Sequence, residues 1–205
     1  MPQALKKQAG GDTIEVRASR VLVLPQPLGA LRFALDASLA GDLFPEEDEV
    51  NLVIDPGFNT FDWFLSRGMD AQFEKCGSFP GGVSAILQEV SHAAGMRLGV
   101  GDINFADCEK ALETGRLNIG GHRHDFTPFR AVAAQAAQAV VDQFLASFNP
   151  ERVGVHNIFL SGGGASFYLE PLRRRLGGFN ITVQPAAVMS NARGYWLYGN
   201  DVVAS

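Results

Sequence analysis

The chain has 205 residues, of which 46% are hydrophobic and 19% are charged. This composition fits one globular domain or two small lobes and excludes a disordered tail. The net charge of −5 excludes a basic nucleic-acid surface over the whole chain, and two distant cysteines argue against a disulfide scaffold or a structural zinc site.

Hydrophobic periodicity predicts an alternation of strands and helices. After a frayed leader at residues 1–12, we expect a strand at 13–24, a helix at 28–39, and strands at 50–55, 61–65 and 71–76. Helices at 83–95 and 105–114 follow, then a hairpin or loop at 116–126 and a long helix from 129 capped by Thr127. The last expected elements are a strand at 155–160, a helix ending at Leu176, a strand at 181–184 and a short helix at 191–198. This order predicts an α/β fold, a mixed sheet flanked by helices, with residues 96–127 as a small inserted subdomain.

The N-terminal residues Met1 to Gly11 are polar, so they do not form a secretory signal. No apolar run approaches the roughly 20 residues needed to span a bilayer. We therefore expect a cytoplasmic protein with no membrane contact and no direct nucleic-acid binding.

The first candidate site is the turn from Asp55 to Asp62, at the end of a near-continuous apolar strand. Successive backbone N–H groups around a glycine form an anion site, and Thr60 adds a hydroxyl donor. Asp55 is suited to hold hydrated Mg²⁺, which prefers one or two carboxylates plus water. The alternative is an Asp-Pro-Gly turn that only joins two strands.

The second candidate is the run Ser161-Gly162-Gly163-Gly164-Ala165 between a buried strand and a helix. Glycines at this position allow a ligand to approach the backbone at a helix N-terminus. The run is neither a Walker A loop nor a GxGxxG fingerprint, and a tight strand-to-helix turn is the alternative. Both candidates follow buried strands, at the edge of an open α/β sheet where ligands bind.

These residues resemble a known family, the actin-like ATPases. Val53 to Trp63 resembles their second phosphate loop, and Ile158 to Ala165 resembles their adenosine motif. Val21 to Leu35 is similar to the strand and crossing helix that enter the second lobe. Asn191 to Trp196 most resembles the plasmid-segregation (ParM/StbA-like) group. The resemblance covers about residues 13–200 and implies a ribonuclease H-like lobe.

The resemblance also implies a site for ATP or ADP with Mg²⁺. Asp55 would organise the Mg²⁺ and the attacking water, and Gln26 would orient that water. The residues that would contact the nucleotide are Gly57, Asn59 and Thr60 at the β- and γ-phosphates and Gly162, Gly163 and Gly164 at the sugar and adenine.

Two features depart from the family pattern. Pro56 stands where an aliphatic residue is usual and removes one N–H group from the loop. The family's first phosphate loop is absent, and the chain is about half the family's length. We therefore expect the end of a first lobe with the crossing helix at residues 13–45, and an actin-like second lobe at 46–205. Alone it would bind nucleotide weakly without hydrolysing it, as a truncated chain or a split gene product.

The resemblance predicts the nucleotide-binding lobe of a filament-forming ATPase that acts in plasmid partition. Its partners would be further copies of itself and a DNA-binding adaptor protein. Two alternatives remain open. One is a small-molecule kinase of the same superfamily. The other is a non-catalytic actin-like interaction module, which the absent loop and Pro56 favour.

His122, His124 and Asp125 are candidates for a separate metal site, since two histidines and a carboxylate suit Zn²⁺. No third histidine lies close in the sequence. The pattern therefore favours a solvent-facing loop.

Overall fold

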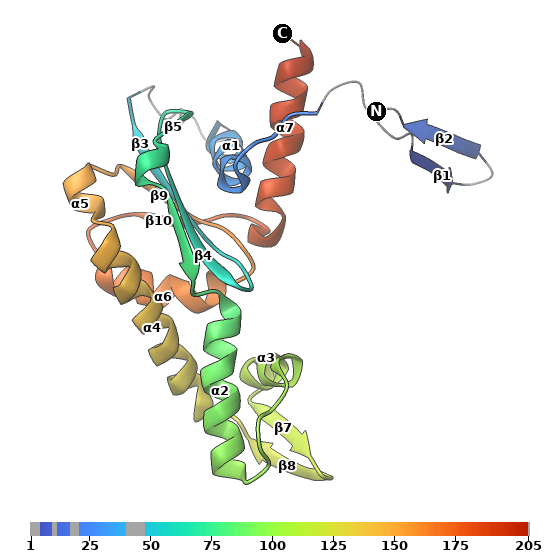
Figure 1. Ribbon diagram of the computed structural model, residues 1–205, viewed down its shortest axis with the longest axis vertical. Coiled ribbons are helices and arrows are strands. Elements are labelled where there is room, and N and C mark those ends of the chain that lie inside the picture. Colours follow the sequence, from blue (N-terminus) through green and yellow to red (C-terminus); the bar gives the residue numbers. More distant parts are fainter. Residues whose placement is uncertain (1–4, 10–11, 17–20, 40–47, 205) are drawn as a thin grey trace.

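The structure, a computed structural model, describes residues 5–9, 12–16, 21–39 and 48–204 (Figure 1). The helices are α1 (Gln26–Leu39), α2 (Val83–Leu98), α3 (Phe105–Thr114), α4 (Phe129–Ser147), α5 (Pro150–Val153), α6 (Ala165–Arg175) and α7 (Ser190–Ala204), with 3₁₀ turns at Phe73–Lys75 and Ala187–Met189. The strands are β1 (Leu5–Ala9), β2 (Asp12–Val16), β3 (Val50–Pro56), β4 (Thr60–Arg67), β5 (Asp70–Ala71), β6 (Gly77–Pro80), β7 (Arg116–Ile119), β8 (His122–Asp125), β9 (Asn157–Leu160) and β10 (Ile181–Val183).

The centre of the fold is a six-stranded mixed sheet in the order β10-β9-β3-β4-β5, with β6 also paired to β4. Strand β3 pairs in parallel with β9 and antiparallel with β4. Every residue of β3 is buried, as its near-continuous apolar sequence predicts for a strand covered on both faces. The parallel pairing brings the carboxyl ends of β3 and β9 to the same edge.

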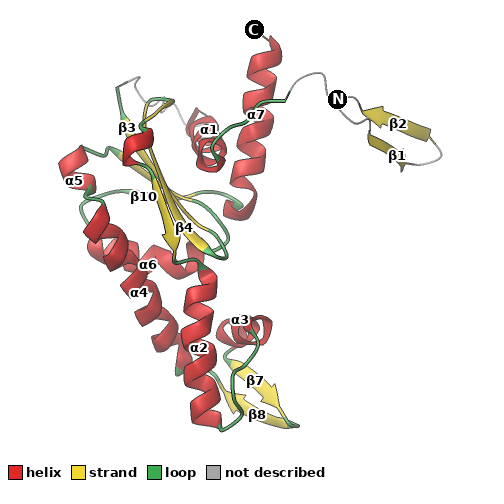
Figure 2. Ribbon diagram, in the orientation of Figure 1, coloured by secondary structure: helices red, strands yellow, loops and turns green. Residues whose placement is uncertain are grey.

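Helices cover both faces of this sheet (Figure 2). Side chains alternate along β3, so Leu52 and Ile54 pack into the larger core under α2, α4 and α6. Val53 points to the opposite face, where it packs with Leu31 and Leu35 of α1. The larger core contains an aromatic group in which the Phe61 ring contacts Phe79, Phe144 and Tyr168.

A small subdomain made of α3 and the β7–β8 hairpin lies beside the far end of α2 (Figure 1). The glycine at position 115 ends α3 in the left-handed conformation, with φ 75°, and the hairpin follows directly. These elements lie within the stretch 96–127 for which an insertion is expected, and the mixed sheet with flanking helices confirms the expected fold class.

Helices α1 and α7 cross at unusually short range. A Cβ atom on Gly194 would lie 1.6 Å from the Gly29 carbonyl oxygen, and one on Gly29 would lie 2.4 Å from the Asn191 carbonyl oxygen. Only glycine at both positions permits this backbone contact. The close approach is what lets polar side chains of α7 reach the backbone of α1.

Several predicted element boundaries were wrong. Residues 21–24, the end of the strand expected at 13–24, are not a strand in the structure. They have no strand pairing, and Val23 is 93% exposed. Alternation alone does not make a strand when no neighbouring strand pairs with the segment. Residues 17–20 of that prediction lie outside the described residues. Residues 5–9, which belong to the expected leader, pair with residues 12–16.

Three further differences have local causes. Within the expected strand 71–76 only Ala71 pairs with β4, because Phe73–Lys75 form a 3₁₀ turn. Pairing with β4 resumes at β6, where Gly77 lies against Trp63 so closely that a Cβ atom would overlap the ring. Thr127 does not cap α4, since its hydroxyl donates to Asp125 Oδ1 at 2.7 Å. The last helix runs on past residue 198 through Gly199, which it accommodates.

Candidate functional site

The two glycine-containing loops touch each other at the carboxyl edge of the sheet. The loop after β9 donates a hydrogen bond from Ser161 N to Ile54 O at 2.9 Å and another from Gly164 N to Pro56 O at 2.8 Å. The neighbouring positions of β3 and β9 in the sheet impose this contact. The structure therefore brings together the residue runs that the sequence singled out separately.

The three glycines of the second loop have different surroundings. Gly162 has φ 77°, and a Cβ there would lie 2.3 Å from Asp55 Oδ1. A Cβ on Gly164 would lie 2.9 Å from Pro56 O. Gly163, by contrast, is exposed, and a Cβ on it would meet nothing within 4 Å. Two glycines thus let the loops approach each other, whereas the third leaves open space above them.

Asp55 is the buried charge of this site, with 5% of its surface exposed. It accepts a hydrogen bond from Asn191 Nδ2 at 2.8 Å. Burial raises the pKa of the Asp55 carboxyl, and the negative charge of Asp62 raises it further. The hydrogen bond from Asn191 and the nearby Ser161 hydroxyl act in the opposite direction. The Ser161 hydroxyl is fully buried beside this carboxylate and makes no hydrogen bond of regular geometry.

The donor set around Asp55 fits Mg²⁺. It consists of hard oxygen atoms: one carboxylate, the unpartnered Ser161 hydroxyl and the nearby Pro56 carbonyl. Among the described residues no group of three or more His, Cys, Asp or Glu side chains is arranged to hold a metal. A single carboxylate accords with Mg²⁺, which keeps several waters and binds together with substrate phosphates.

The loop between β3 and β4 is anchored on the start of α2. The carbonyl groups of Gly57 and Phe58 accept from Val83 N at 3.0 Å and Ser84 N at 2.7 Å. Asn59 O accepts from the backbone N–H groups of Gly81 and Gly82. The first N–H groups of α2 therefore hold the loop in place rather than remaining free for an anion.

Thr60 and Gln26 share a pocket of about 490 Å³ that Asp62 also lines. The Thr60 hydroxyl donates to Asp62 Oδ2 at 2.8 Å, and Ser78 Oγ donates to the other oxygen of that carboxylate. Gln26 is the exposed first residue of α1. The pocket places Gln26 beside the Thr60 end of the hairpin, whereas the triple-glycine loop does not line it.

Sequence reasoning missed the part that Asn191 plays in this site. In the sequence, the motif from Asn191 to Trp196 indicates only a resemblance to a family. Its contact with Asp55 spans 136 positions of sequence, so no local pattern indicates it. The signal that could have found it is a buried carboxylate that needs a donor and an amide at the start of a helix.

The three candidate zinc ligands do not form a metal site among the described residues. His122, His124 and Asp125 lie on β8, a strand of the small hairpin rather than a loop. Asp125 Oδ1 is occupied by the backbone N–H and the hydroxyl of Thr127, and these bonds lower the pKa of its carboxyl.

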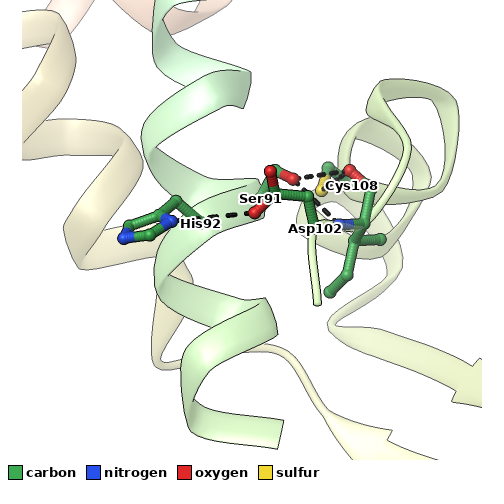
Figure 3. A network of polar contacts seen from close by, with 5 residues as sticks. Ser91, His92, Asp102 and Cys108 are labelled. Atoms are coloured by element: carbon green, nitrogen blue, oxygen red, sulfur yellow. Dashed lines mark hydrogen bonds and ion pairs between the residues drawn. The ribbon is translucent and has the colours of Figure 1, made fainter. Parts of the chain in front are cut away.

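A second polar cluster joins α2 to the loop before α3 (Figure 3). Ser91 Oγ donates to Ile103 O at 2.6 Å and accepts from Ile103 N at 2.9 Å. His92 Nδ1 lies 3.6 Å from Asp102, and both side chains are mostly exposed. Burial raises the pKa of Cys108 to about 11. The Ser91 hydroxyl is bound to backbone and the Cys108 thiol stays protonated, so neither is an activated nucleophile. The cluster instead holds the small subdomain on α2.

None of the helices in the described ranges has the length and apolarity needed to cross a bilayer.

No curated protein sequence matches the chain. Solved structures do match it. The archaeal actin homologue Ta0583 has a TM-score of 0.81 and 17% identity, over 98% of this chain and 63% of that one. The same protein in complex with ADP has a TM-score of 0.79 and 16% identity, over 98% and 64%.

The chain is also similar to the subunit of a 15-stranded ParM filament from Clostridium botulinum, with a TM-score of 0.72 and 18% identity over 93% of this chain and 56% of that one. It thus spans less than two thirds of the length of these relatives. At such identities the likeness shows the fold, and it confirms the expected actin-like lobe. The family model described as archaeal actin homologue MreB-like, C-terminal, matches residues 53–174. The chain therefore belongs to the family of MreB-like archaeal actin homologues and corresponds to their C-terminal domain.

Proposed function

We propose that this chain is the nucleotide-binding lobe of an actin-like, filament-forming ATPase. The observation that carries the proposal is the contact between the Asp55 hairpin and the triple-glycine loop at the carboxyl edge of the sheet. Open α/β sheets bind ligands at this edge. Gly163 leaves room there, and a buried carboxylate lies below it with one oxygen against Gly162.

In this proposal Asp55 binds Mg²⁺ and orients the attacking water, helped by Gln26. Bound Mg²⁺ favours the ionised carboxylate and so offsets the effect of burial. Gly57, Asn59 and Thr60 contact the β- and γ-phosphates, and Gly162, Gly163 and Gly164 contact the sugar and adenine. Pro56 is compatible with this arrangement, because its carbonyl accepts the bond from Gly164 that joins the two loops.

The solved relatives support nucleotide binding and assembly into a filament. One Ta0583 structure is a complex with ADP, and one ParM structure is a filament. We infer for this protein a head-to-tail contact between copies, which does not close and so grows a filament. A role in plasmid partition, an adaptor protein bound to DNA and a cytoplasmic location are further parts of the proposal.

Calorimetry with ADP and ATP, in Mg²⁺ and in EDTA, tests nucleotide binding. We expect binding that weakens in EDTA and in Asp55→Asn. Gly163→Ala adds a methyl group to space that is free of protein atoms, and should weaken binding about tenfold or more without destabilising the fold. Gly178→Ala, also in open space but away from the loops, is its matched control. The absence of any binding by the unmodified chain would contradict the proposal.

Electron microscopy of the protein with Mg-ATP tests the filament. Polymer that appears with ATP and disappears in EDTA is the expected result. Nucleotide turnover that depends on an added hydroxyl or carboxylate acceptor, without polymer, would instead identify a small-molecule kinase.

A further inference from the structure

The side chain of Asn191 joins two parts of the proposed site that are distant in sequence. Its Nδ2 donates to Asp55 Oδ2 at 2.8 Å, and its Oδ1 accepts from the backbone N–H of Ala30 at 3.0 Å. The partners fix which end of the amide is which. The reverse orientation would place the amide oxygen against the carboxylate and the NH₂ group against a backbone N–H.

Both partners bear on the proposed chemistry. Asp55 is the expected Mg²⁺ ligand, and Ala30 lies one helical turn after Gln26 on α1. Asn191 therefore ties the carboxylate to the helix whose first residue is expected to orient the water. It also leaves Asp55 Oδ1 turned toward Gly162, where the absence of a Cβ makes room for it.

The surrounding contacts hold α1 in register with this amide. Gln184 Nε2 donates to Ala30 O at 2.8 Å, so both polar groups of that residue are bound by side chains from the C-terminal part of the chain. Tyr195 Oη donates to Pro25 O at 3.2 Å. The contact between Gly29 and Gly194 brings α7 close enough for a short asparagine side chain to reach.

We propose that Asn191 is a positioning residue of this nucleotide site, which holds the Asp55 carboxylate in a fixed orientation relative to α1. The inference rests on the proposed nucleotide function. It adds a residue that touches neither nucleotide nor Mg²⁺ and acts through Asp55. Partners that orient a metal ligand in this way typically contribute 10- to 100-fold to metal affinity, as an order of magnitude.

Two substitutions separate positioning of Asp55 from support of α1. Asn191→Asp keeps an oxygen for the Ala30 N–H but removes the donor and sets a second carboxylate against Asp55. Asn191→Ala removes both bonds. Positioning predicts that both variants lower Mg²⁺-dependent nucleotide affinity by about 10- to 100-fold, with little change in the weaker binding measured in EDTA. A purely structural role predicts that Asn191→Asp binds like the unmodified protein.

Asp201→Asn is the matched control. It removes the negative charge that pairs Asp201 with Arg32 and so weakens another link between α7 and α1, away from Asp55. We expect it to change nucleotide affinity by less than about threefold, as for most surface substitutions. An effect as large as that of Asn191→Ala would overturn the proposal, because any loosening of the two helices would then be enough.

Unfolding of the nucleotide-free protein gives an independent measurement. Asn191→Asp should lower the unfolding temperature by roughly 5 °C or more, since two carboxylates then face each other out of water. The double variant Asp55→Asn with Asn191→Asp restores one donor and one acceptor across the pair and should recover most of that loss. If the double variant is no more stable than Asn191→Asp, the pair is not coupled and the inference fails.

The two measurements distinguish the possible failures. An unmodified protein that binds no nucleotide, while the double variant recovers stability, would contradict the proposed function and confine Asn191 to orienting Asp55 in the fold. If the unmodified protein binds nucleotide in Mg²⁺ and both Asn191 variants bind it equally well, the positioning role is overturned. The proposed function would then stand.

Discussion

The two faces of the central sheet are built on different principles. Under α2, α4 and α6 the sheet carries a large apolar core in which the Phe61 ring contacts the rings of Phe144 and Tyr168. Under α1 and α7 the apolar cluster is small, and much of the contact is made by glycine backbone and by buried polar side chains.

The difference follows from strand periodicity and has a functional consequence. Residues 52 and 54 of β3 face the large core, so residues 53 and 55 face α1 and α7. Asp55 is therefore presented to the face that holds polar partners for it. We therefore expect the apolar face to supply most of the stability and the polar face to fix the geometry of the site.

The largest expected effect comes from breaking the apolar face. Phe61→Ala removes a fully buried ring at the centre of the aromatic group and should cost about 3–5 kcal/mol of unfolding free energy. Phe58→Ala, in the same hairpin but 54% exposed, should cost less than about 1 kcal/mol. Urea unfolding monitored by circular dichroism measures both. Equal losses would show that this face does not dominate stability.

A smaller effect is expected from forcing the two helices of the polar face apart. Gly194→Ala puts a methyl group onto the backbone of Gly29, which cannot move aside as a side chain would, and should cost about 2–3 kcal/mol. Gly199→Ala on the same helix meets nothing within 4 Å and should gain up to about 1 kcal/mol from helix propensity. The difference in unfolding temperature between these variants measures the contact. A Gly194→Ala protein as stable as Gly199→Ala would mean that the crossing is looser than described.

How far the sequence predicts this molecule also differs between the faces. Local patterns predicted β3, and they placed α3 at Phe105–Thr114 with both ends correct. They placed both loops of the site after buried strands, because the apolar runs and glycines are local signals. The hydrogen bonds of Asn191 and Gln184 to α1 and Asp55 span more than 130 positions. Such contacts depend on the crossing of α1 and α7, which no periodicity encodes.

The smallest effect concerns the charge on the polar face. Burial, more than any other cause, raises the pKa of Asp55, and the facing titratable groups are Asp62 and Tyr195. The folded protein therefore holds this proton more tightly than the unfolded chain, whose aspartate pKa is about 3.9. The stabilising contribution is fully present below that pH and is lost as the pH rises through the folded-state pKa.

Asp55→Asn stays uncharged at every pH and still accepts a hydrogen bond from Asn191. We expect it to be more stable than the unmodified protein at pH 7, by less than the changes above, and equally stable below about pH 4. Thermal unfolding between pH 3 and 8 measures this, with the exposed Asp70→Asn as a control that should stay within about 0.5 kcal/mol of the unmodified protein. A stability gain at pH 7 together with weaker Mg²⁺-dependent nucleotide binding would show that the buried carboxylate is retained for the site at a cost to the fold. A loss of stability at pH 7 would show instead that Asn191 more than compensates the burial of Asp55.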